Sequence, residues 1–282
     1  MKHALYILFL VLATTGMTRE AEKPPPALVS ASLVSENRSI VPGRPFWVAI
    51  RLDIDEGWHL NWINPGDAGL APSVAWNLPD GFEAEELLWP FPRRFLSPEL
   101  SIFGYEKEVI LLSRITAPSA FIPGRTVTLR ARVEWLACRD VCIPGGADVN
   151  LPIEVALGTP EVDPVVSSAL GKARTTLPIV VEDWRFNARL SDNKITVEIH
   201  PPKGETLELS GVLLFPVYEG LIAGTAEQKL TRQEDMYVLD IERPTIRVDT
   251  PDRLLGVLVS AHGWGRIEEK ALLIDVPLNQ KP

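Results

Sequence analysis

A short stretch that ends in two cysteines constrains the fold of this chain more than any other feature. Apolar and polar side chains alternate from Thr126 to Trp135, which is typical of a strand with one buried face. Cys138 and Cys142 follow, and an extended chain would hold their Cα atoms roughly 13 Å apart, whereas a disulfide needs them within about 7 Å. We therefore predict a tight reversal between the cysteines, with Pro144-Gly145-Gly146 ending the regular structure beyond them.

The cysteine pair admits three roles. A bridge that closes so short a loop adds about 2 kcal/mol of stability by the loop-entropy estimate, which is weak for a purely structural link. We therefore favour exchange chemistry, with a structural disulfide and metal binding as the alternatives. Arg139 would favour a reactive thiolate while Glu134 and Asp140 would oppose it, so the sequence does not decide how reactive the thiols are.

The start of the chain has the pattern of an export signal. Lys2 precedes an apolar run from Ala4 to Ala13, and small and polar residues follow up to Thr18. The run is too short to span a bilayer comfortably, so we predict a signal peptide over residues 1–21. Export leads to an oxidising compartment. We expect a periplasmic protein that is soluble after signal removal, because no later segment is long and apolar enough to cross a membrane.

Composition narrows the class of protein further. The 25 prolines punctuate many short alternating segments, which predicts an all-β architecture, and 282 residues suffice for two packed domains. The net charge of -9 and the absence of a basic cluster argue against nucleic acid as a partner. The sequence has no glycine-rich phosphate loop and no nucleophile-elbow serine, and we predict no cofactor.

The strand pattern is interrupted after Leu157. Gly158-Thr159-Pro160 leads into Val162–Thr175, whose apolar residues fit a short helix. We predict a first β domain over residues 24–157, a linker with a short helix over residues 158–181, and a smaller β domain without cysteines over residues 182–282. The predicted strands are Ala27–Ser35, Pro45–Asp55, Ser73–Leu78, Phe82–Trp89, Glu108–Thr116 and Thr126–Trp135, then Trp184–Leu190, Lys194–His200, Gly211–Tyr218, Met236–Ile241, Leu254–Ser260 and Ala271–Val276.

Two segments of the first domain combine aromatic residues with prolines and glycines. Gly57–Pro72 begins as a strand and ends as a loop, and its His59 lacks the further ligands of a metal site, so we predict no metal there. Pro90–Tyr105 contains three prolines, and we expect its first half to be irregular. With its aromatic bulk this segment either covers a reactive site or closes one end of a β-sandwich.

At the cysteine stretch the sequence resembles a known family, the amino-terminal periplasmic region of the thiol:disulfide interchange protein DsbD, and especially its ScsB-like relatives. The matching positions span most of residues 28–157 and occur in the family's order. They are Trp58-His59, Trp62, Asn64-Pro65-Gly66-Asp67-Ala68-Gly69, Trp89-Pro90, Phe103-Gly104-Tyr105-Glu106, and Trp135-Leu136-Ala137-Cys138 through Cys142-Ile143-Pro144.

The resemblance implies an immunoglobulin-like β-sandwich with a protein-disulfide reductase role. Its cysteine pair would take electrons from a membrane-embedded thiol donor and pass them to periplasmic thioredoxin-fold proteins, in processes such as cytochrome complex assembly and copper tolerance. Cys142 would form the mixed disulfide and Cys138 would resolve it. A cap loop within residues 93–105 would shield the disulfide, with Phe95, Phe103 and Tyr105 as the candidate residues.

Two departures from the family limit how much of its function we expect in this chain. The cysteine spacing is shorter than in the best-known DsbD domain, and this sequence lacks the membrane segments and the thioredoxin-like domain. We therefore expect a separate soluble shuttle supplied by another protein. The alternatives are a noncatalytic interaction module with a structural disulfide, and a copper-handling protein in which His59 assists the two cysteines.

Overall fold

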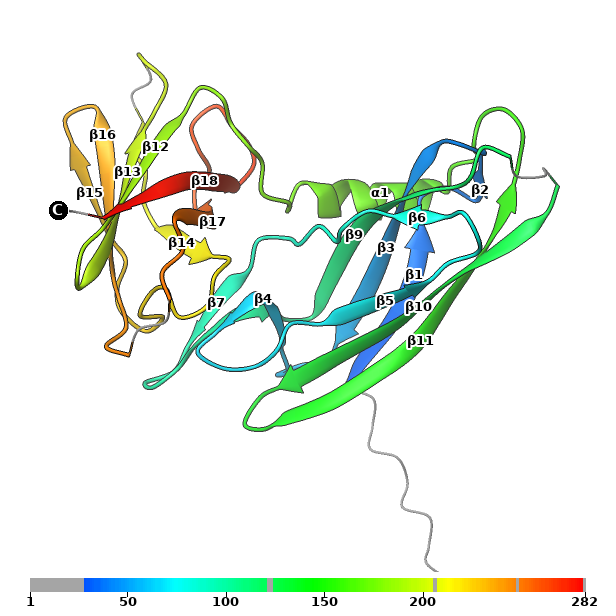
Figure 1. The fold of residues 1–282 in the computed structure, drawn as a ribbon, viewed down its shortest axis with the longest axis horizontal. Coiled ribbons are helices and arrows are strands. Elements are labelled where there is room, and N and C mark those ends of the chain that lie inside the picture. Colours follow the sequence, from blue (N-terminus) through cyan, green and yellow to red (C-terminus); the bar gives the residue numbers. More distant parts are fainter. Residues whose placement is uncertain (1–27, 121–123, 205–206, 247–248, 281–282) are drawn as a thin grey trace, which may run out of the picture.

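The computed structural model describes residues 28–120, 124–204, 207–246 and 249–280. The predicted signal peptide, residues 1–21, lies outside these residues. Strands dominate the described chain and one α-helix accompanies them, so the all-β prediction is confirmed. Figure 1 shows a β-sandwich built from the first half of the chain and a second β unit built from the last third.

Two four-stranded sheets form the sandwich. The strands of the first sheet, in spatial order, are β1 (Val29–Ser35), β3 (Pro45–Ile54), β9 (Glu108–Thr116) and β6 (Glu83–Ala84). Those of the second are β2 (Ser39–Ile40), β11 (Cys142–Val155), β10 (Thr126–Cys138) and β5 (Ser73–Asn77). The predicted alternation on Thr126–Trp135 is confirmed, because Val127, Leu129, Ala131 and Val133 are buried between the sheets.

A smaller three-stranded sheet extends one end of the sandwich. Its order is β4 (Leu60–Gly66), β8 (Ser101–Tyr105) and β7 (Arg93–Leu96). The expectation that the first half of residues 90–105 is irregular is therefore only partly right, since Arg93–Leu96 form strand β7 and pair with β8. A four-residue turn from Ser97 to Leu100 joins the two strands and takes up Pro98, so proline interrupts neither strand.

The prediction that Pro144-Gly145-Gly146 ends the regular structure is wrong. β11 continues through these residues to Val155 and pairs with β10 along its whole length. Besides β10, β11 pairs only with β2, at Glu154 and Val155, so within the described residues Pro144 borders an unpaired strand edge. A proline at such an edge costs the sheet no hydrogen bond, since the missing N–H can face away from β10.

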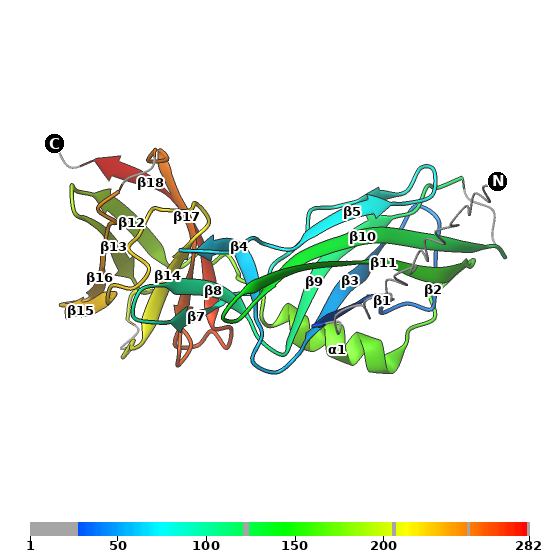
Figure 2. The same cartoon turned by 90° about the horizontal axis from the view of Figure 1, so that it is seen from below.

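The predicted helix is present as α1 (Pro164–Arg174). Asp163 caps its first turn by accepting hydrogen bonds from the backbone N–H groups of Val165 and Val166. Leu170 and Ala173 pack against Ala49 and Leu112 on the outer face of the first sheet. In Figure 2 α1 lies along this sheet, on the side away from β10 and β11. The segment predicted to be a linker is therefore packed onto the sandwich through this helix.

The second β unit consists of one seven-stranded sheet. Its order is β14 (Val212–Pro216), β17 (Arg253–Ser260), β18 (Ala271–Gln280), β12 (Arg185–Leu190), β13 (Lys194–His200), β16 (Met236–Glu242) and β15 (Lys229–Gln233). Sequence analysis did not predict β15 or β2, both of which are short or largely exposed. The ring of Trp264, which lies between Gly263 and Gly265 in the sequence, is fully buried beside Trp184.

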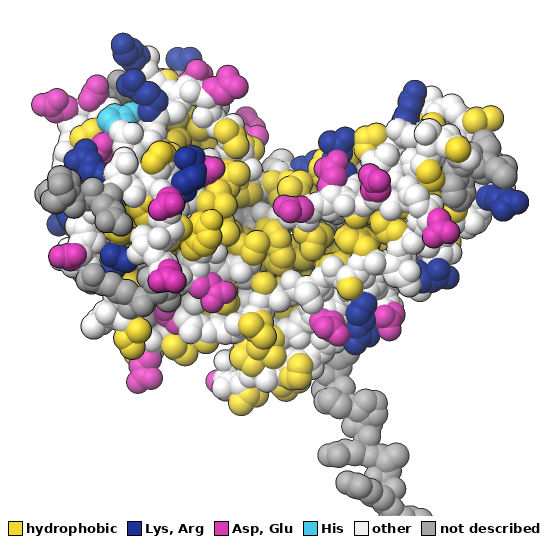
Figure 3. Space-filling model, in the orientation of Figure 1, with side chains coloured by type: hydrophobic (Ala, Val, Ile, Leu, Met, Phe, Trp, Pro, Cys, Tyr) yellow, Lys and Arg dark blue, Asp and Glu magenta, His cyan; other side chains and the backbone are white. Residues whose placement is uncertain are grey.

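Apolar side chains gather at the waist where the two β units meet, as the space-filling view in Figure 3 shows. Within the part of the chain that the structure describes, no helix is long and apolar enough to cross a bilayer.

Candidate functional site

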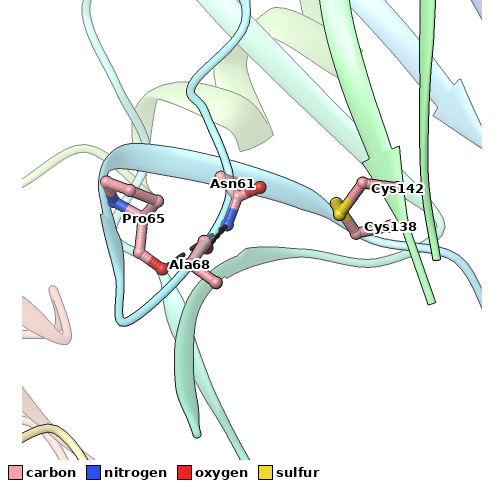
Figure 4. Close-up of a disulfide and its surroundings, with 5 residues drawn as sticks. All are labelled: Asn61, Pro65, Ala68, Cys138 and Cys142. Carbon is pink, nitrogen blue, oxygen red and sulfur yellow. Dashed lines mark hydrogen bonds between the residues drawn. A yellow bond between two sulfur atoms is a disulfide. The ribbon is translucent and has the colours of Figure 1, made fainter. Parts of the chain in front are cut away.

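The two cysteines face each other at the end of the β10–β11 hairpin. The strands pair in register from Thr126 and Glu154 down to Cys138 and Cys142, whose Cα atoms are 4.1 Å apart and whose sulfur atoms form a disulfide. The backbone N–H of Arg139 donates to the carbonyl of Val141 at 3.0 Å and closes the turn. The predicted reversal between the cysteines is therefore confirmed (Figure 4).

The two cysteines differ in exposure. Cys138 is buried, with 4% of its surface accessible, while Cys142 is exposed. The difference arises because Cys138 also pairs with the neighbouring chain segment. Its backbone N–H donates to the carbonyl of His59 at 3.0 Å, and its carbonyl accepts from the N–H of His59 at 2.9 Å. An external thiolate therefore has better access to Cys142.

Charged side chains near the disulfide are largely compensated. The Arg139 guanidinium lies 4.9 Å from the centre of the Trp58 ring, and its Nε is 3.2 Å from the Asp140 carboxylate. Glu134, farther along β10, pairs with Arg132 at 3.5 Å. Arg139 and Asp140, which act in opposite directions on a thiolate, are thus engaged with each other.

A stacked pair of rings flanks the buried cysteine. The imidazole of His59 lies against the Phe95 ring, with centroids 5.7 Å apart and planes inclined by 27°. Burial lowers the pKa of His59, and the charge of Glu106 opposes this shift. The net effect favours the neutral imidazole, which suits contact with an aromatic ring.

The three cap candidates lie on the β7–β8 hairpin but in different surroundings. Phe95 contacts His59, whose backbone pairs with Cys138. Phe103 is buried and meets Phe215 of the second β unit, with ring centroids 5.0 Å apart. Tyr105 is also buried, and its hydroxyl donates to the carbonyl of Pro90 at 2.7 Å. Of the three, Phe95 is the one that contacts a residue paired with a cysteine.

The loop after β4 is folded by amide side chains (Figure 4). The Asn61 Nδ2 donates to the carbonyl of Ala68 at 3.1 Å and to that of Pro65 at 3.4 Å. The Asp67 carboxylate accepts from the backbone N–H of Ser101 at 2.7 Å, which ties the loop to β8. The stretch from Asn61 to Ala68 is therefore a folded platform held by side-chain hydrogen bonds and not a plain connector.

The sequence predicted no metal at His59, but its pairing with Cys138 was not foreseen. The one available signal was that Trp58-His59 belongs to the set of positions on which the family resemblance rests. Among the described residues no group of three or more His, Cys, Asp or Glu side chains is arranged to hold a metal ion. A groove of about 910 Å³ lies elsewhere, between α1 and β9, and neither cysteine lines it.

Comparison with known protein families gives a match over the part of the chain that contains both cysteines. Residues 30–153 match the model of the family described as thiol:disulfide interchange protein DsbD, N-terminal. Residues 30–153 are thus a DsbD/ScsB-like N-terminal domain. The matched residues include both cysteines, His59 and the β7–β8 hairpin, so the DsbD amino-terminal domain contains the whole site described above.

Among solved structures, the N-terminal periplasmic domain of ScsB from Proteus mirabilis superposes with a TM-score of 0.60 and 16% sequence identity. The alignment covers 90% of this chain and 92% of the ScsB chain, so both β units share that fold. The Bacillus cereus pilin subunit BcpA reaches a TM-score of 0.28 at 8% identity, covering 90% of this chain and 69% of that one. No curated protein matched the sequence.

Proposed function

We propose that the DsbD amino-terminal domain of this chain relays reducing equivalents in the periplasm through the Cys138–Cys142 pair. The electrons would come from a membrane-embedded thiol donor and go to exported thioredoxin-fold proteins. The family match supports thiol–disulfide interchange in general. The direction of transfer and the classes of partner are part of the proposal.

The observation that carries the proposal is the unequal exposure of two cysteines joined across a hairpin end. Cys142 is open to solvent, whereas Cys138 is buried and held by His59. In exchange chemistry one sulfur must be reachable by a partner, and the other must stay close enough to resolve the mixed disulfide. The arrangement supports the proposal that Cys142 is attacked and Cys138 resolves the mixed disulfide, the roles that the sequence resemblance implies.

In the reductive direction, a thiolate of the donor attacks Sγ of Cys142 while the Cys138–Cys142 bond breaks and Cys138 leaves as a thiolate. The second thiolate of the donor then attacks the donor sulfur that is bonded to Cys142, which releases the Cys142 thiolate. Two electrons have moved to this chain, and the donor has become a disulfide. The reverse steps, started by the Cys142 thiolate on a client disulfide, return this pair to its oxidised form.

Apolar side chains near the pair provide a surface for partners. Val141 lies between the cysteines in the turn and is 62% exposed. Leu96 and Leu100 flank the turn of the β7–β8 hairpin and are also exposed. Both turns project from the lower edge of the molecule in Figure 1. A partner thiol that approaches Cys142 would meet these side chains first.

Trapping experiments test the assignment of the two sulfurs. Cys138→Ser leaves the exposed Cys142 as the only thiol and should accumulate a stable mixed disulfide with a thioredoxin-fold protein. Cys142→Ser is the matched control, and it should accumulate far less, because its remaining thiol is buried. Equal trapping by both variants would contradict the assigned roles.

The reduction potential of the wild-type pair tests the function itself. Exchange proteins have potentials of about -120 to -270 mV, and structural bridges lie below about -300 mV. We expect a value in the first range together with rapid exchange under native conditions. A value in the second range with slow exchange would instead support a noncatalytic interaction module with a structural disulfide.

A further inference from the structure

The β7–β8 hairpin touches the disulfide region on one side and the second β unit on the other. Phe95 of β7 stacks on His59, which is hydrogen bonded to Cys138 through the backbone. The strands of the hairpin pair so that Phe95 lies opposite Ile102, next to Phe103 of β8. The position of Phe95 therefore depends on how β8 is held.

An aromatic residue of the second β unit holds β8. Phe215 of β14 is buried and meets the Phe103 ring edge-on at 5.0 Å. The same Phe215 ring meets Trp62 of β4 at 6.3 Å, again edge-on. One side chain of the second unit is thus packed against two neighbouring strands of the three-stranded sheet, and edge-on contacts of this kind fix ring orientation.

Asn64 adds a directional link between the two units. Its Nδ2 donates to the carbonyls of Pro216 at 2.7 Å and Tyr218 at 3.2 Å, while its Oδ1 accepts from the N–H of Gly66 at 2.9 Å. The Asn64 side chain is buried. Because a buried amide that loses its partners carries an uncompensated desolvation penalty, this link resists sliding of β4 over β14.

Two further contacts join the second unit to the hairpin, one at Arg94 and one at Ser101, which pairs with Leu96 beside the turn. Arg94 of β7 donates from Nη1 to the carbonyl of Ala226 at 3.3 Å. Gly224 packs so closely on β8 that an added Cβ would lie 2.8 Å from the Cβ of Ser101. The tip of the hairpin is free by comparison, with Leu96 55% and Leu100 44% exposed. The second unit therefore contacts both strands of the hairpin, and Leu96 and Leu100 beside the turn remain exposed.

We propose that the second β unit is the fixed support of the β7–β8 hairpin. Phe215 and Asn64 are then positioning residues that hold Phe95 against His59. The inference rests on the proposed function, because shielding the cysteine pair has a purpose only if the pair takes part in exchange. It gives the cysteine-free second unit a role in the reactivity of the first. The hairpin then covers the Cys138 side of the pair without moving as a whole, and Cys142 remains the exposed sulfur.

The rate of reduction of the disulfide by dithiothreitol tests this support. The reagent supplies two electrons and two protons to the cysteine pair and becomes a cyclic disulfide, so no protein partner is needed. In the full chain, Phe215→Ala should raise the rate constant about tenfold, because the loosened hairpin uncovers the pair more often. Hydrogen exchange should show lost protection in residues 93–105. Phe215→Leu, which refills most of the volume, should restore most of the wild-type rate.

Two comparisons separate positioning from general destabilisation. Phe95→Ala removes the shielding ring directly and should raise the rate to a similar extent, and adding Phe215→Ala to it should change little, because both act through the same hairpin. Leu239→Ala is the matched control, since Leu239 is fully buried in β16, away from the hairpin. It should lower the melting temperature without changing the reduction rate.

The inference is overturned if Phe95→Ala accelerates reduction while Phe215→Ala does not, or if Leu239→Ala accelerates it as much as Phe215→Ala. Should Phe215→Ala not fold, Asn64→Ala takes its place with the same expected results. A wild-type pair that exchanges with no partner under native conditions would remove the proposed function. The relative rates of the variants would still decide whether the second unit positions the hairpin.

Discussion

At the scale of single residues, close backbone approaches frame the disulfide region. Gly104 of β8 lies against β4 so tightly that an added Cβ would be 2.1 Å from the carbonyl oxygen of Leu60. Gly145 lies opposite Trp135, and an added Cβ there would be 2.4 Å from the Trp135 Nε1. Gly104 and its neighbours belong to the positions on which the family resemblance rests. Close packing between strands thus gives a physical reason for glycine at these sites.

A pair of identical substitutions tests this reading. Gly104→Ala should lower the free energy of unfolding by about 1–3 kcal/mol, because the backbone of Leu60 must shift to admit a methyl group. Gly171→Ala in α1 should raise it by about 0.5–1 kcal/mol, since nothing lies within 4 Å of an added Cβ and alanine is the better helix former. Urea unfolding measures both, and equal effects would contradict the packing argument.

His59 should make stability sensitive to mild acid. Its folded-state pKa is lowered by burial, so the unfolded chain binds a proton at higher pH than the folded chain. Stability contributed by the neutral ring is fully present above the unfolded pKa of about 6.5, and is lost as the pH falls from there towards the folded pKa. His59→Gln should therefore shrink the difference in urea midpoint between pH 7.5 and pH 5.

The control for this pH effect is His262→Gln, which changes an exposed histidine of the second β unit. It should leave the difference between the two pH values as it is in the wild type. If both variants behave alike, the acid sensitivity has its origin elsewhere than His59.

At the scale of elements, packing decides which segments act as parts of a domain. α1 has the sequence features of an independent helix, with Asp163 as its N-cap and Pro164 in its first turn. Its buried face nevertheless completes a small apolar cluster with Ala49 and Leu112. The β7–β8 hairpin likewise gains its order from β4 on one side and β14 on the other.

Substitutions on the two faces of α1 test whether the helix is part of the sandwich. Leu170→Ala should reduce the free energy of unfolding by about 2–5 kcal/mol, because Leu170 is buried against the first sheet. Val165→Ala, on the exposed face, should change it by less than about 0.5 kcal/mol. A free linker helix would give small effects for both, as followed by chemical denaturation.

At the scale of the whole molecule, the two β units share an interface of buried aromatic rings and a buried amide. Phe103, Trp62 and Phe215 supply the rings, and Asn64 supplies hydrogen bonds to the backbone of the second unit. Interfaces between domains that move freely are more polar than this. The units should therefore behave as one body around the site.

Unfolding of the full chain should accordingly occur in one transition, with calorimetry and tryptophan fluorescence giving the same midpoint. Phe215→Ala should weaken the coupling and separate the transitions of the two units. Two well-resolved transitions in the wild type would show that the interface does not couple them.

The sequence predicted much of this protein because local patterns report local structure. Alternation identified most strands, the helix was found from its periodicity, and the spacing of Cys138 and Cys142 required a reversal between them. It failed at Pro144 and at Arg93–Leu96, because nearby prolines signal a break there whereas pairing with a neighbouring strand decides the outcome. A proline at an unpaired edge costs nothing, and only the assembled sheet shows which edge is unpaired.

The chain sequence by itself therefore determined the all-β class, the hairpin that joins the cysteines and the family resemblance around them. Only the tertiary structure decided that Cys138 is buried and Cys142 exposed, that Phe95 rather than Phe103 or Tyr105 flanks the pair, and that Phe215 and Asn64 connect the second unit to the hairpin. Burial and contacts between residues more than a hundred positions apart depend on how the sheets pack, and no local pattern records that packing.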